Sequence, residues 1–219
     1  RVSAVWSRMN ACALPALPAL IAIAGTNGKG SSVSMLESIY RHAGYATGSF
    51  TSPHLQRFNE RICLNNVPVD DASLLVAFEQ IEALRAEISL TFFEYNVLLA
   101  LQIFCAANLD IILLEVGMGG RLDAVNIVDN QLALITAIDL DHCDWLGETR
   151  EQIGAEKAGI IKPGGMAVIA YFAAPQSLSN TARQQGADFV AAGPDYQIQE
   201  GANGETVFYS DHAALSAFS

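Results

Sequence analysis

A glycine-rich segment with one lysine is the part of this sequence best suited to chemistry. It follows the apolar run 20–24 and precedes a helical pattern. Glycines let the backbone take positive φ angles and approach a ligand closely, so successive N–H groups and the N-terminus of the following helix can point at phosphate oxygens. The hydroxyls of Ser31 and Ser32 could position Mg²⁺. We therefore predict an ATP-binding phosphate loop made of Gly25, Thr26, Asn27, Gly28, Lys29, Gly30 and Ser31.

This loop departs from the usual phosphate-loop pattern, which places Ser or Thr directly after the lysine. Here Gly30 follows Lys29. The alternative interpretation is a glycine turn between a strand and a helix, with its lysine in solvent. The scarcity of lysine argues against that interpretation, because the chain contains only Lys29, Lys157 and Lys162.

Three candidate ligands come at the ends of apolar runs that are typical of buried strands: Ser52 after 45–50, Glu115 within 109–116 and His142 after 132–138. In open α/β sheets, ligands bind at the carboxyl ends of the strands. Glutamate is rarely buried without a partner, so Glu115 is a candidate Mg²⁺ ligand or attacking group. The alternative is that Glu115 forms a structural ion pair. His142 is either a ligand or a turn histidine with structural partners. Ser52 either faces the phosphates or forms a turn.

The segment Thr91-Phe92-Phe93-Glu94 opens the second of two helices that the sequence predicts over 71–87 and 91–108. Thr91 and Glu94 have the spacing of a capping box. From the residues alone, the segment is equally well a helix start with core aromatics or part of a binding site.

Apolar runs and helical patterns alternate along the chain, which predicts an α/β fold with a mostly parallel sheet flanked by helices, in one domain over residues 1–219. The segment 55–70 is predicted to be a long loop or a hairpin insertion, and 195–210 to begin a second hairpin. Further helices are predicted over 2–13, 32–43, 148–160 and 175–185, and further strands over 166–170 and 187–191.

Composition excludes several classes of protein. A net charge of −11 disfavours binding to nucleic acid or anionic lipid, since both depend on clustered Lys and Arg. The longest apolar stretch, 97–109, is shorter than the roughly 20 residues that a membrane-spanning helix needs. The 4 cysteines lie far apart in a sequence without an evident signal peptide, which favours reduced thiols. We expect a cytoplasmic monomer that binds neither nucleic acid nor membrane.

Six motifs together resemble the folylpolyglutamate synthase/dihydrofolate synthase family, within the Mur ligase superfamily. The resemblance extends from residue 1 to about residue 219 and implies a Mur ligase-type central ATPase domain. The motifs are the loop 25–31, Thr51-Ser52-Pro53-His54-Leu55, Phe58-Asn59-Glu60-Arg61, the segment 115–124, Asp141-His142 with Trp145-Leu146-Gly147, and Glu156-Lys157-Ala158-Gly159.

The resemblance implies an ATP-dependent amide ligase that joins L-glutamate to the carboxylate of dihydropteroate, and then to the γ-carboxylate of a folate. It implies ATP contacts from 26–29, Mg²⁺ ligands at Ser52, Glu115 and His142, and a carbamylated Lys157 near a second metal. Lys29, Glu115, His142 and Lys157 would carry the reaction. Pterin contacts are implied for Thr91, Phe92, Phe93, Glu94, Leu122, Asp123 and Ala124.

Family members also have a pterin-contacting loop upstream and a C-terminal domain that supplies further ATP and glutamate contacts. Neither is recognisable in these 219 residues. We therefore expect this chain to be part of a longer enzyme that lacks here its C-terminal glutamate-binding domain, and not to ligate by itself.

Two other functions stay open from the sequence. One is a cell-wall Mur ligase, which joins amino acids to a muramyl nucleotide; Gly30 after the lysine and the 91–94 segment favour the folate enzyme instead. The other is a nucleotide-binding regulatory or motor domain. The metal ligands implied together with Lys157 argue against it.

Overall fold

The chain folds around one eight-stranded sheet with the strand order β4-β3-β2-β5-β1-β6-β7-β8. The structure is a computed structural model and describes residues 1–12, 14–200 and 206–210. The strands of the sheet are β1 (Ala19–Ala24), β2 (Thr47–Phe50), β3 (Ile62–Leu64), β4 (Val67–Pro68), β5 (Ile111–Glu115), β6 (Leu132–Ile135), β7 (Met166–Ile169) and β8 (Asp188–Ala191). A separate antiparallel pair is formed by β9 (Tyr196–Glu200) and β10 (Thr206–Ser210).

Strands β2, β5, β1, β6, β7 and β8 are parallel. Beyond β2 the sheet is extended by β3, which is antiparallel to β2, and by β4, which is antiparallel to β3. The carboxyl ends of β1, β2 and β5 therefore lie together at the same end of the strands. An open parallel sheet binds its ligands at this end.

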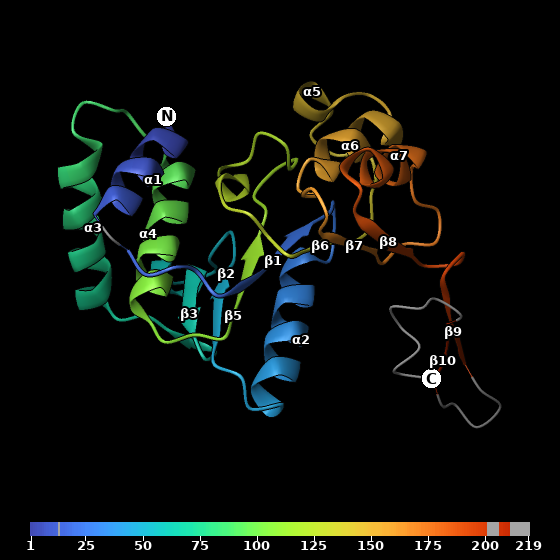
Figure 1. The fold of residues 1–219 in the computed structure, drawn as a ribbon, viewed down its shortest axis with the longest axis horizontal. Coiled ribbons are helices and arrows are strands. Elements are labelled where there is room, and N and C mark those ends of the chain that lie inside the picture. Colours follow the sequence, from blue (N-terminus) through green and yellow to red (C-terminus); the bar gives the residue numbers. More distant parts are fainter. Residues whose placement is uncertain (13, 201–205, 211–219) are drawn as a thin grey trace.

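Helices cover both faces of the sheet (Figure 1). On one face lie α1 (Val2–Ala11), α3 (Asp71–Arg85) and α4 (Phe92–Ala106), which pack on one another, and α6 (Arg150–Ala158) with α7 (Gln176–Gln185). On the other face α2 (Lys29–His42) packs on β1, β2 and β5. The short α5 (Cys143–Leu146) and the 3₁₀ turns η1 (Phe58–Arg61) and η2 (Ala124–Ile127) lie in connections.

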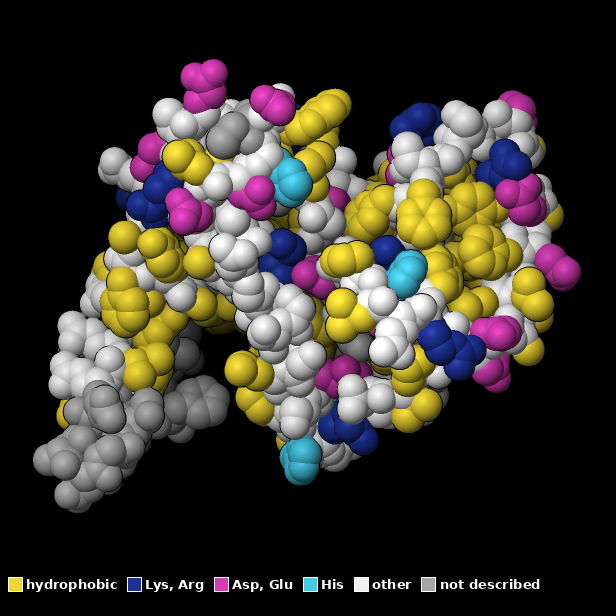
Figure 2. Space-filling model, turned by 180° about the vertical axis from the view of Figure 1, so that it is seen from behind, with side chains coloured by type: hydrophobic (Ala, Val, Ile, Leu, Met, Phe, Trp, Pro, Cys, Tyr) yellow, Lys and Arg dark blue, Asp and Glu magenta, His cyan; other side chains and the backbone are white. Residues whose placement is uncertain are grey.

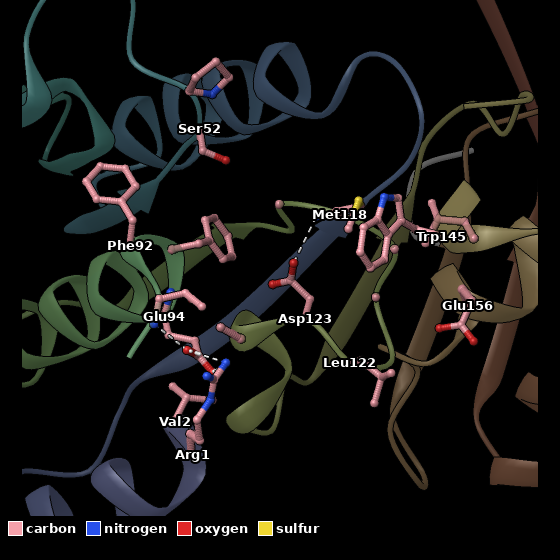
Figure 3. A pocket seen from close by; sticks show the side chains of 18 of the residues that line it. Arg1, Val2, Ser52, Phe92, Glu94, Met118, Leu122, Asp123, Trp145 and Glu156 are labelled. Atoms are coloured by element: carbon pink, nitrogen blue, oxygen red, sulfur yellow. Dashed lines mark hydrogen bonds and ion pairs between the residues drawn. The ribbon is translucent and has the colours of Figure 1, made fainter. Parts of the chain in front are cut away.

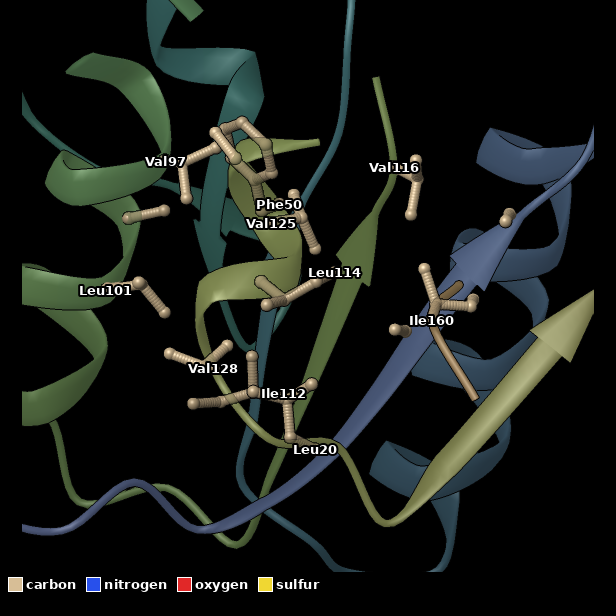
Figure 4. Packing of buried hydrophobic residues seen from close by; sticks show 14 of the residues in the cluster. Leu20, Phe50, Val97, Leu101, Ile112, Leu114, Val116, Val125, Val128 and Ile160 are labelled. Carbon is tan, nitrogen blue, oxygen red and sulfur yellow. The ribbon is translucent and has the colours of Figure 1, made fainter. Parts of the chain in front are cut away.

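The central strands are apolar throughout because both of their faces are buried. In β1, Leu20 and Ala22 belong to the larger core beneath α1, α4, α6 and α7, while Ile21 and Ile23 belong to the smaller core beneath α2. Figure 4 shows the larger core, where residues of β1, β2 and β5 meet α4 and η2. These cores hold the strand ends, and thus the loops that follow them, in fixed positions.

The predicted α/β architecture is confirmed, including the antiparallel insertion in 55–70 and the hairpin after 195. The two largest boundary errors are of three residues each. Helix α2 begins at Lys29 instead of residue 32, and β6 ends at Ile135 instead of residue 138. The second error has a tertiary cause: the Ala137 carbonyl accepts a hydrogen bond from the Thr26 N–H at 2.7 Å, which draws the chain from β6 onto the glycine loop. Helix α5 was also missed.

No helix in the described part of the chain is both long enough and apolar enough to cross a membrane.

Candidate functional site

The predicted phosphate loop connects β1 to α2 at the carboxyl end of the parallel strands. Gly28 is the residue before α2 and has a φ of 86°, a conformation that favours glycine. At Gly25 a Cβ would overlap the Thr136 hydroxyl, so only glycine fits there. The N-terminal N–H groups of α2 follow directly, and they form the positive end of the helix dipole.

Two lysines meet at this loop. Lys29 donates to the carbonyl oxygens of Gly25, at 3.0 Å, and Thr26, at 3.4 Å. Lys157, from α6, is buried and donates to the same Gly25 carbonyl at 2.9 Å. Burial, with the nearby charge of Lys29, lowers the pKa of Lys157 to about 8. The chain thus concentrates positive charge at one turn although it has very few lysines.

Glu115 ends β5 beside this loop. Its side chain is 5% exposed, and its Oε2 accepts a hydrogen bond from the Ser52 backbone N–H at 2.9 Å. A Cβ at position 30 would lie 3.8 Å from both Glu115 carboxylate oxygens, so the carboxylate faces the loop. Burial raises the pKa of Glu115, partly offset by the Ser52 N–H and by the charge of Lys29. The structure therefore brings Glu115 and Ser52 together next to the phosphate loop.

His142 lies on an exposed turn before α5, with a φ of 49°. Its Nε2 is 3.6 Å from Asp141 Oδ2. Among the described residues, no three His, Cys, Asp or Glu side chains are close enough together to hold a metal ion. The structure thus groups Ser52 and Glu115 and brings the Lys157 amine from α6 to the adjacent loop. Among the described residues, His142 makes no hydrogen bond or ion pair with any of these three.

The donor chemistry nevertheless fits a hard divalent cation. Glu115 Oε1 accepts no hydrogen bond from any described residue, which leaves a buried carboxylate oxygen free to bind a cation. Carboxylate oxygens are the ligands that Mg²⁺ prefers in proteins.

A cavity of about 640 Å³ opens next to Ser52. It lies between the half of the molecule with α1, α3 and α4 and the half with α5 to α7, where the space-filling view is hollowed (Figure 2). All seven residues implied to contact a pterin line this cavity, together with Ser52 (Figure 3). They are Thr91, Phe92, Phe93, Glu94, Leu122, Asp123 and Ala124.

Both parts of that lining are held by local structure. Thr91 and Glu94 form the predicted capping box, in which the Glu94 N–H donates to Thr91 Oγ1 at 3.2 Å. Asp123 accepts hydrogen bonds from the N–H groups of Met118 and Val125, at 3.0 and 2.9 Å. Burial raises the pKa of Asp123. The Phe93 ring packs where a side chain at Gly117 would otherwise lie, so this glycine makes room for it.

Sequence reasoning missed other residues that line the cavity, among them Arg1, Arg61, Trp145 and Glu156. Arg1 forms an ion pair with Glu94 at 3.3 Å, and Glu156 pairs with Arg121 at 2.8 Å. Arg61, Trp145 and Glu156 belong to motifs that the resemblance covered without giving them a role, and this was the one signal that could have found them.

The chain matches the family description "Mur ligase middle domain" over residues 23–213. It is 46% identical, over 187 residues, to the dihydrofolate synthase/folylpolyglutamate synthase of Escherichia coli strain K12, a match that covers 85% of this chain and 44% of that protein.

Solved structures agree with this match. E. coli FolC in complex with DHPP and ADP superposes with a TM-score of 0.91 at 41% identity, covering 96% of this chain and 50% of FolC. A bifunctional folylpolyglutamate synthase/dihydrofolate synthase with Mn, AMPPNP and L-glutamate bound gives 0.88 at 43% identity, covering 97% and 51%. The chain therefore spans about half the length of the relatives it matches.

Proposed function

Because the chain belongs to the Mur ligase family, whose middle domain it carries, we propose that it supplies the ATP and acceptor sites of a dihydrofolate synthase/folylpolyglutamate synthase. This enzyme would add L-glutamate to dihydropteroate and to the γ-carboxylates of folates. One observation carries the proposal: Ser52 lines the acceptor cavity with its side chain, while its N–H binds Glu115 beside the glycine loop. Nucleotide and acceptor would therefore meet at Ser52.

A carboxylate is a poor electrophile, so it must be activated before an amine can attack it. In the reaction we propose, a carboxylate oxygen of the acceptor attacks the γ-phosphorus of ATP, and ADP leaves. The glutamate amine then attacks the carbonyl carbon of the acyl phosphate and loses a proton, and phosphate leaves as the amide forms. The first step joins two anions. Lys29, the N–H groups of the loop and the N-terminus of α2 would bind the phosphates and offset this repulsion.

We propose Mg²⁺ as the metal, bound by Glu115 and Ser52 and completed by His142 and by Lys157 as a carbamate. When bound, Mg²⁺ would supply positive charge between the nucleotide and the acceptor. The lowered pKa of Lys157 supports the carbamate, since it leaves part of the amine neutral near neutral pH, and only a neutral amine reacts with CO₂.

The cavity would hold the pterin end of the acceptor. The rings of Phe92 and Phe93 offer flat apolar surface, and the Asp123 carboxyl offers a hydrogen-bonding group inside it. Residues 1–219 would act as one unit in this role. We further propose a cytoplasmic, monomeric enzyme, in keeping with the free thiols of Cys12, Cys63 and Cys105.

The test measures phosphate release by the full-length product of the gene that encodes this chain, with ATP, Mg²⁺ and L-glutamate. Dihydropteroate, tetrahydrofolate and a muramyl nucleotide are compared as acceptors. We expect both pterins to stimulate release and the muramyl nucleotide not to. Stimulation by the muramyl nucleotide alone would assign a cell-wall ligase, and release that is independent of any acceptor would assign a regulatory or motor domain. The Lys29→Met variant controls for a contaminating ATPase.

A further inference from the structure

Arg61 is a buried cation in the wall of the acceptor cavity. It ends η1 directly before β3, and its side chain is 7% exposed although it lines the cavity. Its guanidinium carbon lies 5.4 Å from the centre of the Phe92 ring, and its Nε donates to His54 Nδ1 at 2.8 Å. These contacts fix the position of the guanidinium plane at the edge of the cavity.

The charge of Arg61 is uncompensated in the part of the chain that the structure describes. Within the described residues, no Asp or Glu forms an ion pair with Arg61, and neither of its two Nη groups has a hydrogen-bond partner. The other arginine of the cavity wall, Arg1, is already paired with Glu94. Taking a charge out of water is costly, and burial accordingly lowers the pKa of Arg61. A buried guanidinium with open Nη groups is a site for an anion.

The position of Arg61 indicates which anion would bind there. The Arg61 carbonyl accepts a hydrogen bond from the Thr51 N–H at 2.9 Å, so Arg61 lies across from the residue that precedes Ser52. Ser52 in turn binds Glu115. Residues 25–31 of the phosphate loop do not line this cavity, so the phosphates of a nucleotide on that loop would lie on the far side of Ser52. The cavity end at Arg61 therefore faces the bound acceptor.

We propose that Arg61 binds the carboxylate of the acceptor substrate and holds it at the Ser52 end of the cavity. This inference rests on the function proposed above and names the group that recognises the acceptor's charge. The guanidinium would offer its two Nη groups to the two carboxylate oxygens, while His54 and Phe92 keep it in place. Arg61 is thus a substrate-binding residue that selects an acid over a neutral analogue.

The first test compares Arg61→Gln with Arg57→Gln in the full-length gene product. Arg57 is on the same connection and carries the same charge, but it is exposed and lies outside the cavity. We expect Arg61→Gln to raise the KM for dihydropteroate about 10- to 100-fold, as the loss of a charged hydrogen-bond partner does. The KM values for ATP and L-glutamate should stay within about twofold. Arg57→Gln should change none of the three. A rise in the KM for glutamate or ATP instead of dihydropteroate would overturn the proposal.

The second test separates recognition of charge from damage to the cavity. Binding of dihydropteroate and of its carboxamide is measured by calorimetry for the native protein and for Arg61→Gln. The native protein should prefer the acid about 10- to 100-fold, and the variant should bind the two within about threefold. An equal preference for the acid in both proteins would show that Arg61 does not bind the carboxylate.

The two hypotheses fail in different ways. If the native protein ligates dihydropteroate but the acid preference survives in Arg61→Gln, only the role of Arg61 is wrong. If the native protein neither binds nor ligates dihydropteroate, the proposed function is wrong and the role of Arg61 falls with it. Should Arg61→Gln not fold, as judged by its circular dichroism melt, Arg61→Lys is measured in the same way. The lysine keeps the positive charge but lacks the pair of Nη donors, so this variant should retain a reduced preference for the acid.

Discussion

The glycine loop and the acceptor cavity meet at Ser52, yet they are built in opposite ways. The loop is one continuous segment, and its ligand-binding groups are mainly backbone N–H groups and a helix end. The cavity wall is made mainly of side chains from segments far apart in the chain, from residue 1 to residue 156. A loop of this kind depends on glycines at fixed positions, whereas the cavity depends on the sheet that brings its segments together.

The loop is therefore expected to tolerate almost no added atoms, and the cavity to tolerate changes that keep its helices in place.

Gly25→Ala should have the largest effect, because the new Cβ would overlap the Thr136 hydroxyl and the residue has a φ of 154°. We expect a loss of about 2–5 kcal/mol in the free energy of unfolding, together with loss of ATP binding. Urea denaturation measures the free energy of unfolding, and calorimetry measures ATP binding. Gly44→Ala is the matched control, since Gly44 has a φ of 92° but no atoms near its Cβ position, and it should cost only about 1 kcal/mol. Equal costs at both positions would mean that the contact with Thr136 is unimportant.

Glu115→Gln should lower kcat about 100- to 1000-fold and leave the fold intact. Burial raises the pKa of Glu115, so the folded protein favours the protonated form and the ionised carboxylate costs stability above its ordinary pKa. Without divalent cations, the variant should thus melt at a higher temperature than the native protein at pH 7.5. This difference should shrink as the pH falls to about 4, where the native carboxyl is protonated. Normal ligation with Mg²⁺ by this variant would rule out a role for Glu115 in the reaction.

Lys157→Met should change how stability depends on pH. The pKa of Lys157 is lowered from 10.5 to about 8, so between these values the unfolded chain binds more protons than the folded one, and native stability rises with pH. We expect the variant to lose most of this rise, which amounts to about 2–3 kcal/mol. Urea titrations at pH 7 to 10, in CO₂-free buffer, measure it. Lys162→Met, which removes a lysine that pairs with Asp129, is the control and should retain the native slope.

Thr91→Ala should have the smallest effect, about 1 kcal/mol of stability, from loss of the cap of α4. Since Thr91 also lines the cavity, the KM for the acceptor should rise. Thr149→Ala removes the equivalent capping box of α6, outside the cavity, and should cost the same stability at an unchanged KM. If both variants raise the KM equally, the effect comes from general loosening and not from the cavity wall.

Local sequence predicted the elements well where local forces decide them. The apolar runs of β1 and β5 are buried on both faces, and the capping box at Thr91 and Glu94 closes within one turn. The errors arose where contacts with distant segments determine where an element begins or ends. Strand β6 ends early because Ala137 hydrogen-bonds to Thr26, and the turn at His142 leads into α5, whose four residues carry no periodic pattern.

The same division holds for the site. The sequence by itself determined the glycine loop, because positive φ angles and close backbone approach require particular residues at particular positions. It also determined that Glu115 ends a buried strand. Only the tertiary structure decided that Lys157 reaches the Gly25 carbonyl from 132 residues away, and that Arg61 enters the cavity with no acid partner among the described residues. Contacts of this kind depend on the order of strands in the sheet, which brings together residues whose spacing along the chain gives no sign that they will meet.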